Sequence, residues 1–215
     1  MTPVRILIAD DHEVVRQGVR AVLEAEPEWI VCGEASSGRE AVAKAVELRP
    51  EVVVLDISMP ELNGLEATRQ IRSAVPAKIL ILTVHESDQV VTEVLDAGAD
   101  GYVLKTDAGR KLVEAIQALL QNQTFVTERV RTVATRPAGR RPGAAGTRGS
   151  ARLTARQREV LQLLTEGRSN KEIGARLGMT TKTAETHRTQ IMAKLNLHSM
   201  SELVRYAIRN RIIEP

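Results

Sequence analysis

Residues 4–13 read VRILIADDHE, and this stretch decides the architecture of the first half of the chain. Mostly apolar residues fill positions 4–9, as in a buried strand, and the run stops abruptly at Asp10 and Asp11. Neighbouring carboxylates repel each other, so the acid pair does not stabilise a strand end by itself. The pair therefore indicates a chemical role for the acids at the point where the strand ends.

The pattern of residues 4–13 is repeated along the first 121 residues, where short apolar runs alternate with stretches of helical periodicity. Ser37 followed by Glu40 predicts a capping box, and Pro50 and Pro76 stand where helices must end. Such strict alternation predicts an α/β fold with a doubly wound parallel sheet, whose functional loops follow the carboxyl ends of the strands. Strands are expected at residues 4–9, 29–35, 52–55, 78–82 and 101–104, and helices near 13–25, 37–49, 64–74, 87–97 and 107–121.

Composition excludes several classes of protein. Only 2% of the 215 residues are aromatic, which argues against aromatic ligand pockets and base-stacking platforms. The single cysteine, Cys32, excludes an intramolecular disulfide and a cysteine-rich zinc site. The N-terminus does not resemble a signal peptide, and no apolar run approaches the roughly 20 residues of a membrane span. We therefore expect a soluble, cytoplasmic protein without a membrane partner.

The distribution of charge divides the chain. Residues 1–128 carry a net charge of −9, residues 129–150 carry +6 and residues 151–215 carry +6. The basic end is compatible with a polyanionic partner such as DNA or with a solvated surface. Residues 134–150 are rich in Gly, Pro, Ala and Arg, which favours a flexible tether over a phosphate-binding segment. The predicted domains are 1–121 and 151–215, joined by a linker at 122–150.

Three acids are expected to converge in the first domain. Asp10 and Asp11 follow the first strand and Asp56 follows the third, and carboxyl ends of parallel strands share one edge of a sheet. A hard cation such as Mg2+ would relieve the repulsion among the carboxylates. Thr83 and Lys105 end two further strands at the same edge. The set predicts a phosphoryl-transfer site in which Asp56 attacks phosphorus and Lys105 neutralises charge.

The acid pair, together with LDISMP (55–60), LTV (82–84) and GYVLK (101–105), resembles the receiver domain of two-component response regulators over about residues 3–121. The resemblance implies a flavodoxin-like, five-stranded sheet of order 2-1-3-4-5. It implies that Asp56 is the phospho-acceptor and that Lys105 contacts the phosphoryl group. By the same likeness, Asp11 binds Mg2+ directly, Asp10 binds it mainly through water, and the backbone carbonyl of Ser58 is a further ligand.

The receiver likeness also implies a switch, in which Thr83 moves towards the phosphate and Tyr102 changes its rotamer. An ordinary half-buried aromatic is the alternative for Tyr102. We expect His12 to be a solvent-facing histidine at a helix start rather than a ligand. Trp29 and Cys32 are interpreted as sheet residues.

The last 63 residues have helical periodicity throughout, with helices expected near 155–165, 170–177, 181–195 and 200–210. Capping boxes are predicted at Thr154, Ser169 and Ser199, an N-cap at Thr180, and helix C-caps at Gly167 and Gly178. Helix, tight turn and longer helix over 169–195 predict a helix-turn-helix. Its core is expected to join Ile173 and Leu177 to Ala184, Ile191 and Leu195, with close helix approach at Gly174 and Ala175. Polar residues outside this packing stripe form a candidate DNA face, namely Lys182, Glu185, Thr186, Arg188 and Thr189.

The segment SNKEIGARLGMTTKTAETHRTQI (169–191) resembles the four-helix DNA-binding domain of the NarL/FixJ (LuxR-type) regulators, and the likeness extends over nearly all of 151–213. It implies that Glu185, Thr186 and Thr189 face bases. It implies phosphate contacts by Lys182, Arg188, Asn170 and Lys171. A helical dimer module with a solvated charged face is the alternative.

Together the two resemblances imply a transcription regulator that accepts a phosphoryl group from a sensor histidine kinase and then forms homodimers on double-stranded promoter DNA. We expect no enzymatic activity beyond self-phosphorylation and slow autodephosphorylation. Two alternatives stay open. A Mg2+-dependent aspartyl-phosphate phosphatase is disfavoured by Ser58 at the place of a general acid, and a small-molecule-sensing regulator by the scarcity of aromatic residues.

Overall fold

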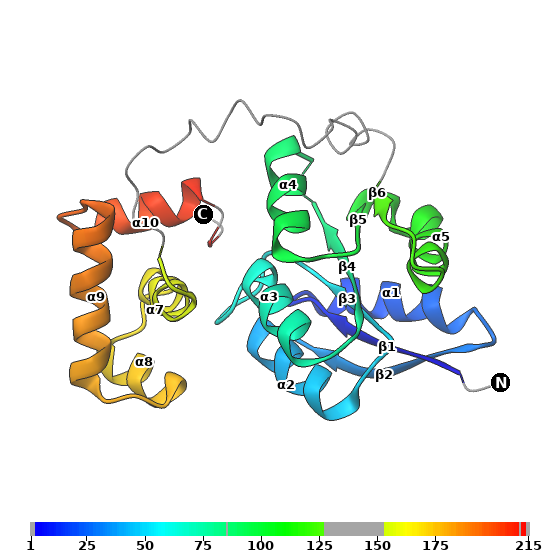
Figure 1. Ribbon diagram of the computed structural model, residues 1–215, viewed down its shortest axis with the longest axis horizontal. Coiled ribbons are helices and arrows are strands. Elements are labelled where there is room, and N and C mark those ends of the chain that lie inside the picture. The colour runs from blue at the N-terminus through cyan, green and yellow to red at the C-terminus, as the bar shows by residue number, and fades with distance from the viewer. Residues whose placement is uncertain (1–2, 85, 127–152, 211, 214–215) are drawn as a thin grey trace. The chain divides into compact units, whose positions relative to one another are not determined.

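A computed structural model of the chain describes residues 3–84, 86–126, 153–210 and 212–213 (Figure 1). The chain divides into two compact units, Met1–Arg136 and Pro137–Pro215. Most of the predicted linker, including residues 134–150, lies outside the described residues. Within the described ranges, every helix is too short or too polar to cross a membrane.

The first unit contains a six-stranded sheet in which each neighbouring pair of strands is parallel. Its order, β2-β1-β3-β4-β5-β6, confirms the expected order 2-1-3-4-5. The predicted count of five strands was one short, because the two-residue strand β6 pairs with β5 in a stretch that the sequence assigned to the linker. The strands are β1 Val4–Ala9, β2 Trp29–Ala35, β3 Val52–Leu55, β4 Lys78–Thr83, β5 Gly101–Leu104 and β6 Phe125–Val126.

Helices cover both faces of the sheet, so successive strand residues enter two different cores. Leu7 and Ala9 of β1 pack with residues of α2, α3 and α4, whereas Ile6 and Ile8 pack with residues of α1 and α5 (Figure 1). Burial on both faces explains why β1, β3 and β4 are nearly continuous apolar runs. The helices are α1 Glu13–Glu24, α2 Gly38–Leu48, α3 Gly64–Ala74, α4 Asp88–Ala97 and α5 Ala108–Leu120, and a 3-10 turn, η1 Lys105–Asp107, precedes α5.

The second unit packs four described helices around one core. Ile173, Leu177, Ala184 and Ile191 are buried there and Leu195 packs against them, as expected for a helix-turn-helix. The helices are α7 Ala155–Thr165, α8 Asn170–Leu177, α9 Thr181–Leu195 and α10 Met200–Arg209.

The close approach of α8 to the turn requires a glycine at position 174. A Cβ added to Gly174 would lie 2.7 Å from the carbonyl oxygen of Met179. Ala175, which the sequence assigned to the same approach, is exposed, so that prediction was wrong. Gly178 ends α8 in the left-handed conformation, as predicted.

Two of the four predicted capping boxes are complete, at Thr154 and Ser169. The other two are half formed. The hydroxyl of Ser37 accepts a hydrogen bond from the backbone N of Glu40, but the Glu40 carboxylate accepts from the backbone N of Ser36. Ser199 and Glu202 show the same one-residue offset, because Glu202 accepts from the backbone N of His198. The N-cap at Thr180 is formed.

Candidate metal centre and nucleic-acid interface

The acids of the first unit converge because of the register of the sheet. Ala9 of β1 lies opposite Leu55 of β3, so Asp10 and Asp56 leave the sheet side by side. The backbone N of Asp56 donates to the carbonyl of Ala9 at 2.8 Å. Both side chains are buried, each 3% exposed, whereas Asp11 is exposed. The predicted convergence of Asp10 and Asp56 is therefore present.

Lys105 follows β5 and contacts the acids that follow β1 and β3. Thr83, the last residue of β4, lies opposite Leu104 of β5, and Lys105 follows directly. The Lys105 Nζ lies 2.7 Å from Asp10 Oδ2 and 2.8 Å from Asp56 Oδ2. Asp56 Oδ1 accepts a hydrogen bond of 2.7 Å from the backbone N of Ile57. The Lys105 ammonium thus contacts one oxygen of each buried carboxylate.

The electrostatics of this pocket favour added positive charge. Burial raises the pKa of Asp56 to about 6, with a further upward contribution from Asp10, although the Lys105 ammonium opposes the rise. Burial acts to lower the pKa of Lys105, but its hydrogen bonds to Asp10 and Asp56 outweigh this effect and leave it raised. One ammonium therefore does not fully compensate two buried carboxylates.

A close approach of backbone to backbone shapes the loop after Asp56. The backbone N of Gly64 donates to the carbonyl of Ile57 at 2.8 Å. A Cβ added to Gly64 would lie 1.9 Å from the carbonyl oxygen of Asp56, so only glycine fits without a shift of the backbone. Ser58 lies in this loop and is partly buried. Its assignment as a carbonyl ligand stays a prediction.

The two residues of the predicted switch are completely buried. Thr83 and Tyr102 are each 0% exposed, and Tyr102 packs in the core formed with α2, α3 and α4. The interpretation of Tyr102 as a half-buried aromatic is therefore wrong. Its change of rotamer stays a prediction.

His12 is an exposed residue at the start of α1, as expected, and its ring also contacts the acid pair. Its side chain is 61% exposed, but its Nδ1 lies 2.9 Å from Asp11 Oδ1 and 3.2 Å from Asp10 Oδ1. One ligand atom each of Asp10, Asp11, His12 and Asp56 falls within 4.8 Å of the others. The three carboxylates in this group are the hard oxygen donors that suit Mg2+.

Arg16 of α1 is a further residue of the site, and the sequence patterns do not reveal it. Its guanidinium donates to the carbonyl oxygen of Asp10 at 2.8 Å and to Glu34 of β2 at 3.1 Å. Arg20 donates to the same Glu34 carboxylate but not to the pocket. Arg16 thus fixes the backbone at the acid pair. A contact between residues 16 and 34 has no signature in helix or strand periodicity.

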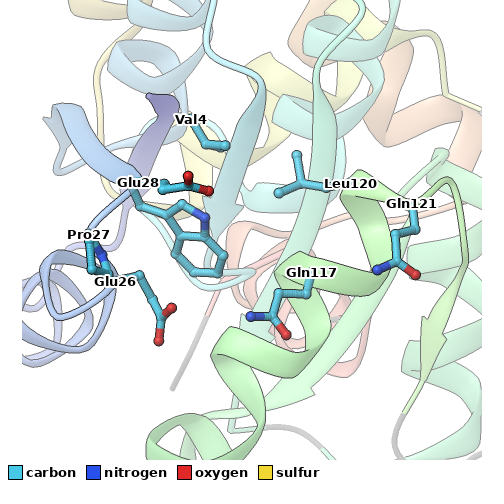
Figure 2. A pocket seen from close by; sticks show the side chains of 8 residues that line it. Val4, Glu26, Pro27, Glu28, Gln117, Leu120 and Gln121 are labelled. Carbon is cyan, nitrogen blue, oxygen red and sulfur yellow. The ribbon is translucent and has the colours of Figure 1, made fainter. Parts of the chain in front are cut away.

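A cavity of about 610 Å3 lies at the opposite edge of the sheet (Figure 2). Its wall includes Val4 and Trp29, the first residues of β1 and β2, whereas the acids follow the last residues of the strands. Trp29 is 8% exposed, in agreement with its interpretation as a sheet residue. This cavity is therefore separate from the acid pocket. The remaining lining residues are Glu26, Pro27, Glu28, Gln117, Leu120 and Gln121.

The candidate DNA face lies on the exposed side of α9. All five of its residues, Lys182, Glu185, Thr186, Arg188 and Thr189, are exposed, and Ala184 and Ile191 are buried on the other side. The hydroxyls of Thr186 and Thr189 donate to carbonyls one turn earlier in the helix. On α8, Lys171 is exposed and Asn170 is partly buried. The roles of these residues towards bases and phosphates stay predictions.

Comparisons with known proteins match both units. Residues 6–117 match the response regulator receiver domain, and residues 151–207 match the luxR family of bacterial regulatory proteins. The transcriptional regulatory protein LiaR of Bacillus subtilis (strain 168) is 40% identical over 216 residues, covering 98% of this chain and 99% of LiaR. The oxygen regulatory protein NreC of Staphylococcus epidermidis is 38% identical over 216 residues, with the same coverage of each chain.

Solved structures agree with the relatives. A structure of two RcsB dimers bound to two parallel DNAs has a TM-score of 0.58 and 28% identity, and covers 95% of this chain and 98% of that chain. Both units and their order in the chain thus have counterparts in response regulators.

Proposed function

Because the chain belongs to the two-component response regulators that join a receiver domain to a LuxR-type DNA-binding domain, we propose that Asp56 is its phospho-acceptor and that phosphorylation controls its binding to promoter DNA. The placement of Asp10, Asp56 and Lys105 carries the proposal. Two buried carboxylates contact one ammonium at 2.7 Å and 2.8 Å, beside a third carboxylate, which is a costly arrangement unless further charge arrives.

In the proposed transfer, an oxygen of ionised Asp56 attacks phosphorus of a phosphohistidine on the kinase. An O–P bond forms and the P–N bond breaks, and the ring, which carries a proton on its other nitrogen, leaves as neutral imidazole with the electron pair of that bond. Lys105 neutralises charge on the transferring oxygens, since its ammonium already contacts Asp56. Asp10, Asp11, Asp56 and the carbonyl of Ser58 would hold Mg2+, which when bound favours the ionised acids and offsets charge on the phosphoryl group.

Incubation with acetyl phosphate and Mg2+, followed by intact-mass analysis, tests the acceptor. We expect one added phosphoryl group on the wild type, none on Asp56→Asn, and one on the control Glu47→Gln, which alters an exposed acid of α2. Labelling of Asp56→Asn to the level of the wild type would overturn the assignment.

For the second unit, we propose that phosphorylation promotes a homodimer that binds paired half-sites through α9. The exposed polar face of α9 supports this proposal, and the relative RcsB is described as dimers bound to DNA. Linking two weak DNA-binding modules raises the effective concentration of the second. Since DNA and the kinase are the partners, the proposed location is the cytoplasm.

We further propose that the unphosphorylated receiver masks the DNA-binding unit. Residues 1–128 carry a net charge of −9, whereas residues 129–150 and 151–215 each carry a net charge of +6, so the acidic and basic parts attract each other. Promoter affinity of the full chain and of residues 151–215 alone tests masking. Equal affinities would contradict it.

No turnover of an external phosphoester is part of the proposal, because Ser58 occupies the position where an aspartyl-phosphate phosphatase needs a general acid.

A further inference from the structure

We infer that His12 is a nitrogen ligand of the acid pocket, so that the pocket binds divalent transition metals such as Mn2+, Co2+ and Zn2+ more tightly than its carboxylates alone would. The inference rests on the proposed metal site and goes beyond it by adding a ligand of a different chemical class. The observation behind it is the position of His12 Nδ1, which lies 2.9 Å from Asp11 Oδ1 and 3.2 Å from Asp10 Oδ1.

These distances are those of neighbouring ligands around one ion. Metal–ligand bonds of about 2.1 Å at right angles place two donor atoms about 3.0 Å apart. The His12 Nδ1 atom is already at about this spacing from each of the two Oδ1 atoms. A cation can therefore replace the hydrogen bond between imidazole and carboxylate without a large movement of either group.

The two oxygens of Asp10 face different partners. Oδ2 contacts Lys105 at 2.7 Å, whereas Oδ1 accepts the backbone N of His12 at 2.9 Å and faces its ring. Asp11 is exposed beside it. Lys105 and His12 therefore do not compete for the same oxygen, and the ammonium can stay in place when an ion binds to Asp11 and His12.

Imidazole changes which cation is favoured. Mg2+ prefers oxygen ligands and retains several waters, so an added nitrogen contributes little to its binding. First-row transition metals bind imidazole well, and their affinities rise from Mn2+ to Cu2+ at a given site. The ring of His12 is 61% exposed, so an ion can reach it from solvent. His12 thus shifts the preference of the pocket away from Mg2+.

Pulsed EPR of Mn2+ bound to the full chain tests the ligand directly, because modulation of the electron spin echo reports nitrogen bonded to the ion. The variants are His12→Ala and His12→Gln, and the control is His198→Ala, an exposed histidine of the second unit. We expect imidazole modulation in the wild type and in the control, and none in either His12 variant. Protein labelled with 15N-histidine should show the matching isotope change.

Calorimetric titrations with Mn2+ and Mg2+ give the second readout. We expect the ratio of Mn2+ to Mg2+ affinity to fall at least about tenfold in His12→Ala, since loss of even an outer-shell partner costs about that much. The inference is overturned if Mn2+ binds in competition with Mg2+ but shows no nitrogen modulation, or if the ratio does not change. Those results would leave the proposed function intact. Absence of all metal binding, together with no labelling of Asp56, would overturn both.

Discussion

The acid pocket of the first unit and the exposed face of α9 in the second are built in opposite ways. The pocket takes Asp10, Asp56 and Lys105 from three different strand ends and buries the two acids to 3% exposure. The face of α9 takes all of its polar residues from one helix and leaves them in solvent. In the pocket, each charged side chain contacts at least one of the others and interacts with them electrostatically. On the helix, each side chain acts nearly alone.

This difference predicts how single substitutions behave. A change in the pocket disturbs groups in a region of low dielectric constant, so its effect is large and depends on pH and on metal. A change on the helix face removes one solvated contact, so its effect is small and depends on salt.

The largest effect is expected for Gly64→Ala. Its Cβ would lie 1.9 Å from the carbonyl oxygen of Asp56, so the backbone of the pocket loop must move. We expect the free energy of unfolding of the first unit to fall by about 3 kcal/mol or more. Urea denaturation measures this, with Gly18→Ala in α1 as the control, because a Cβ at Gly18 meets nothing within 4 Å. Equal stability of the two variants would show that the loop does not constrain Asp56.

The second prediction concerns pH. The pKa of Asp56 is about 6 in the folded chain against an ordinary value of 3.8, so the folded chain binds the proton more tightly. The stability that this group contributes is present below pH 3.8 and is lost as pH rises through about 6. Without metal, Asp56→Asn should therefore raise the free energy of unfolding at pH 7.5 by up to about 3 kcal/mol, and the gain should vanish near pH 4. Denaturation at both values, with Glu47→Gln as the control, checks this. A gain that is independent of pH would show that the pKa of Asp56 is not raised in the folded chain.

A smaller effect is expected for Arg16→Ala. The side chain donates to the carbonyl of Asp10 and holds the backbone beside the acid pair. We expect affinity for Mg2+ to fall about tenfold, as for other groups that orient metal ligands. Arg20→Ala is the matched control, since Arg20 contacts the same Glu34 without touching the pocket. Equal losses in the two variants would assign the effect to packing of α1 on β2.

The smallest effect is expected on the helix face, for Lys182→Ala. Loss of one phosphate contact should weaken binding about equally on all DNA sequences and reduce the slope of log affinity against log salt by about 1. Titrations of promoter and unrelated DNA at several salt concentrations measure it. A loss confined to the promoter sequence would show that Lys182 contacts a base edge instead.

The sequence predicted most of the fold, because the periodicity of apolar residues is strong in both units. Strands 4–9, 29–35, 52–55 and 101–104 have the predicted bounds, and helix α9 spans 181–195 as expected. Strand β6 was missed because two residues are too few to show alternation. The capping boxes at Ser37 and Ser199 are incomplete because the glutamate reaches one residue further back, a choice of rotamer that the motif does not encode.

The sequence predicted only those residues of the site that directly follow strands. Asp10, Asp56 and Lys105 meet because the carboxyl ends of parallel strands share one edge of the sheet. The contacts of His12 and Arg16 depend on the direction of a side chain and on a partner in another element, and neither is visible in the spacing of residues. The adjacency of His12 to Asp11 in the sequence was the available signal for their contact.

In the proposed function, phosphorylation of Asp56 controls DNA binding by α9. The most direct test is a promoter-DNA titration of the full chain with and without acetyl phosphate and Mg2+, alongside a mass measurement of the oligomer. We expect phosphodonor and Mg2+ together to tighten binding and to raise the dimer fraction of the wild type, and we expect neither change in Asp56→Asn. Equal responses of the two proteins, or none in a wild type that carries the phosphoryl group, would contradict the proposed function.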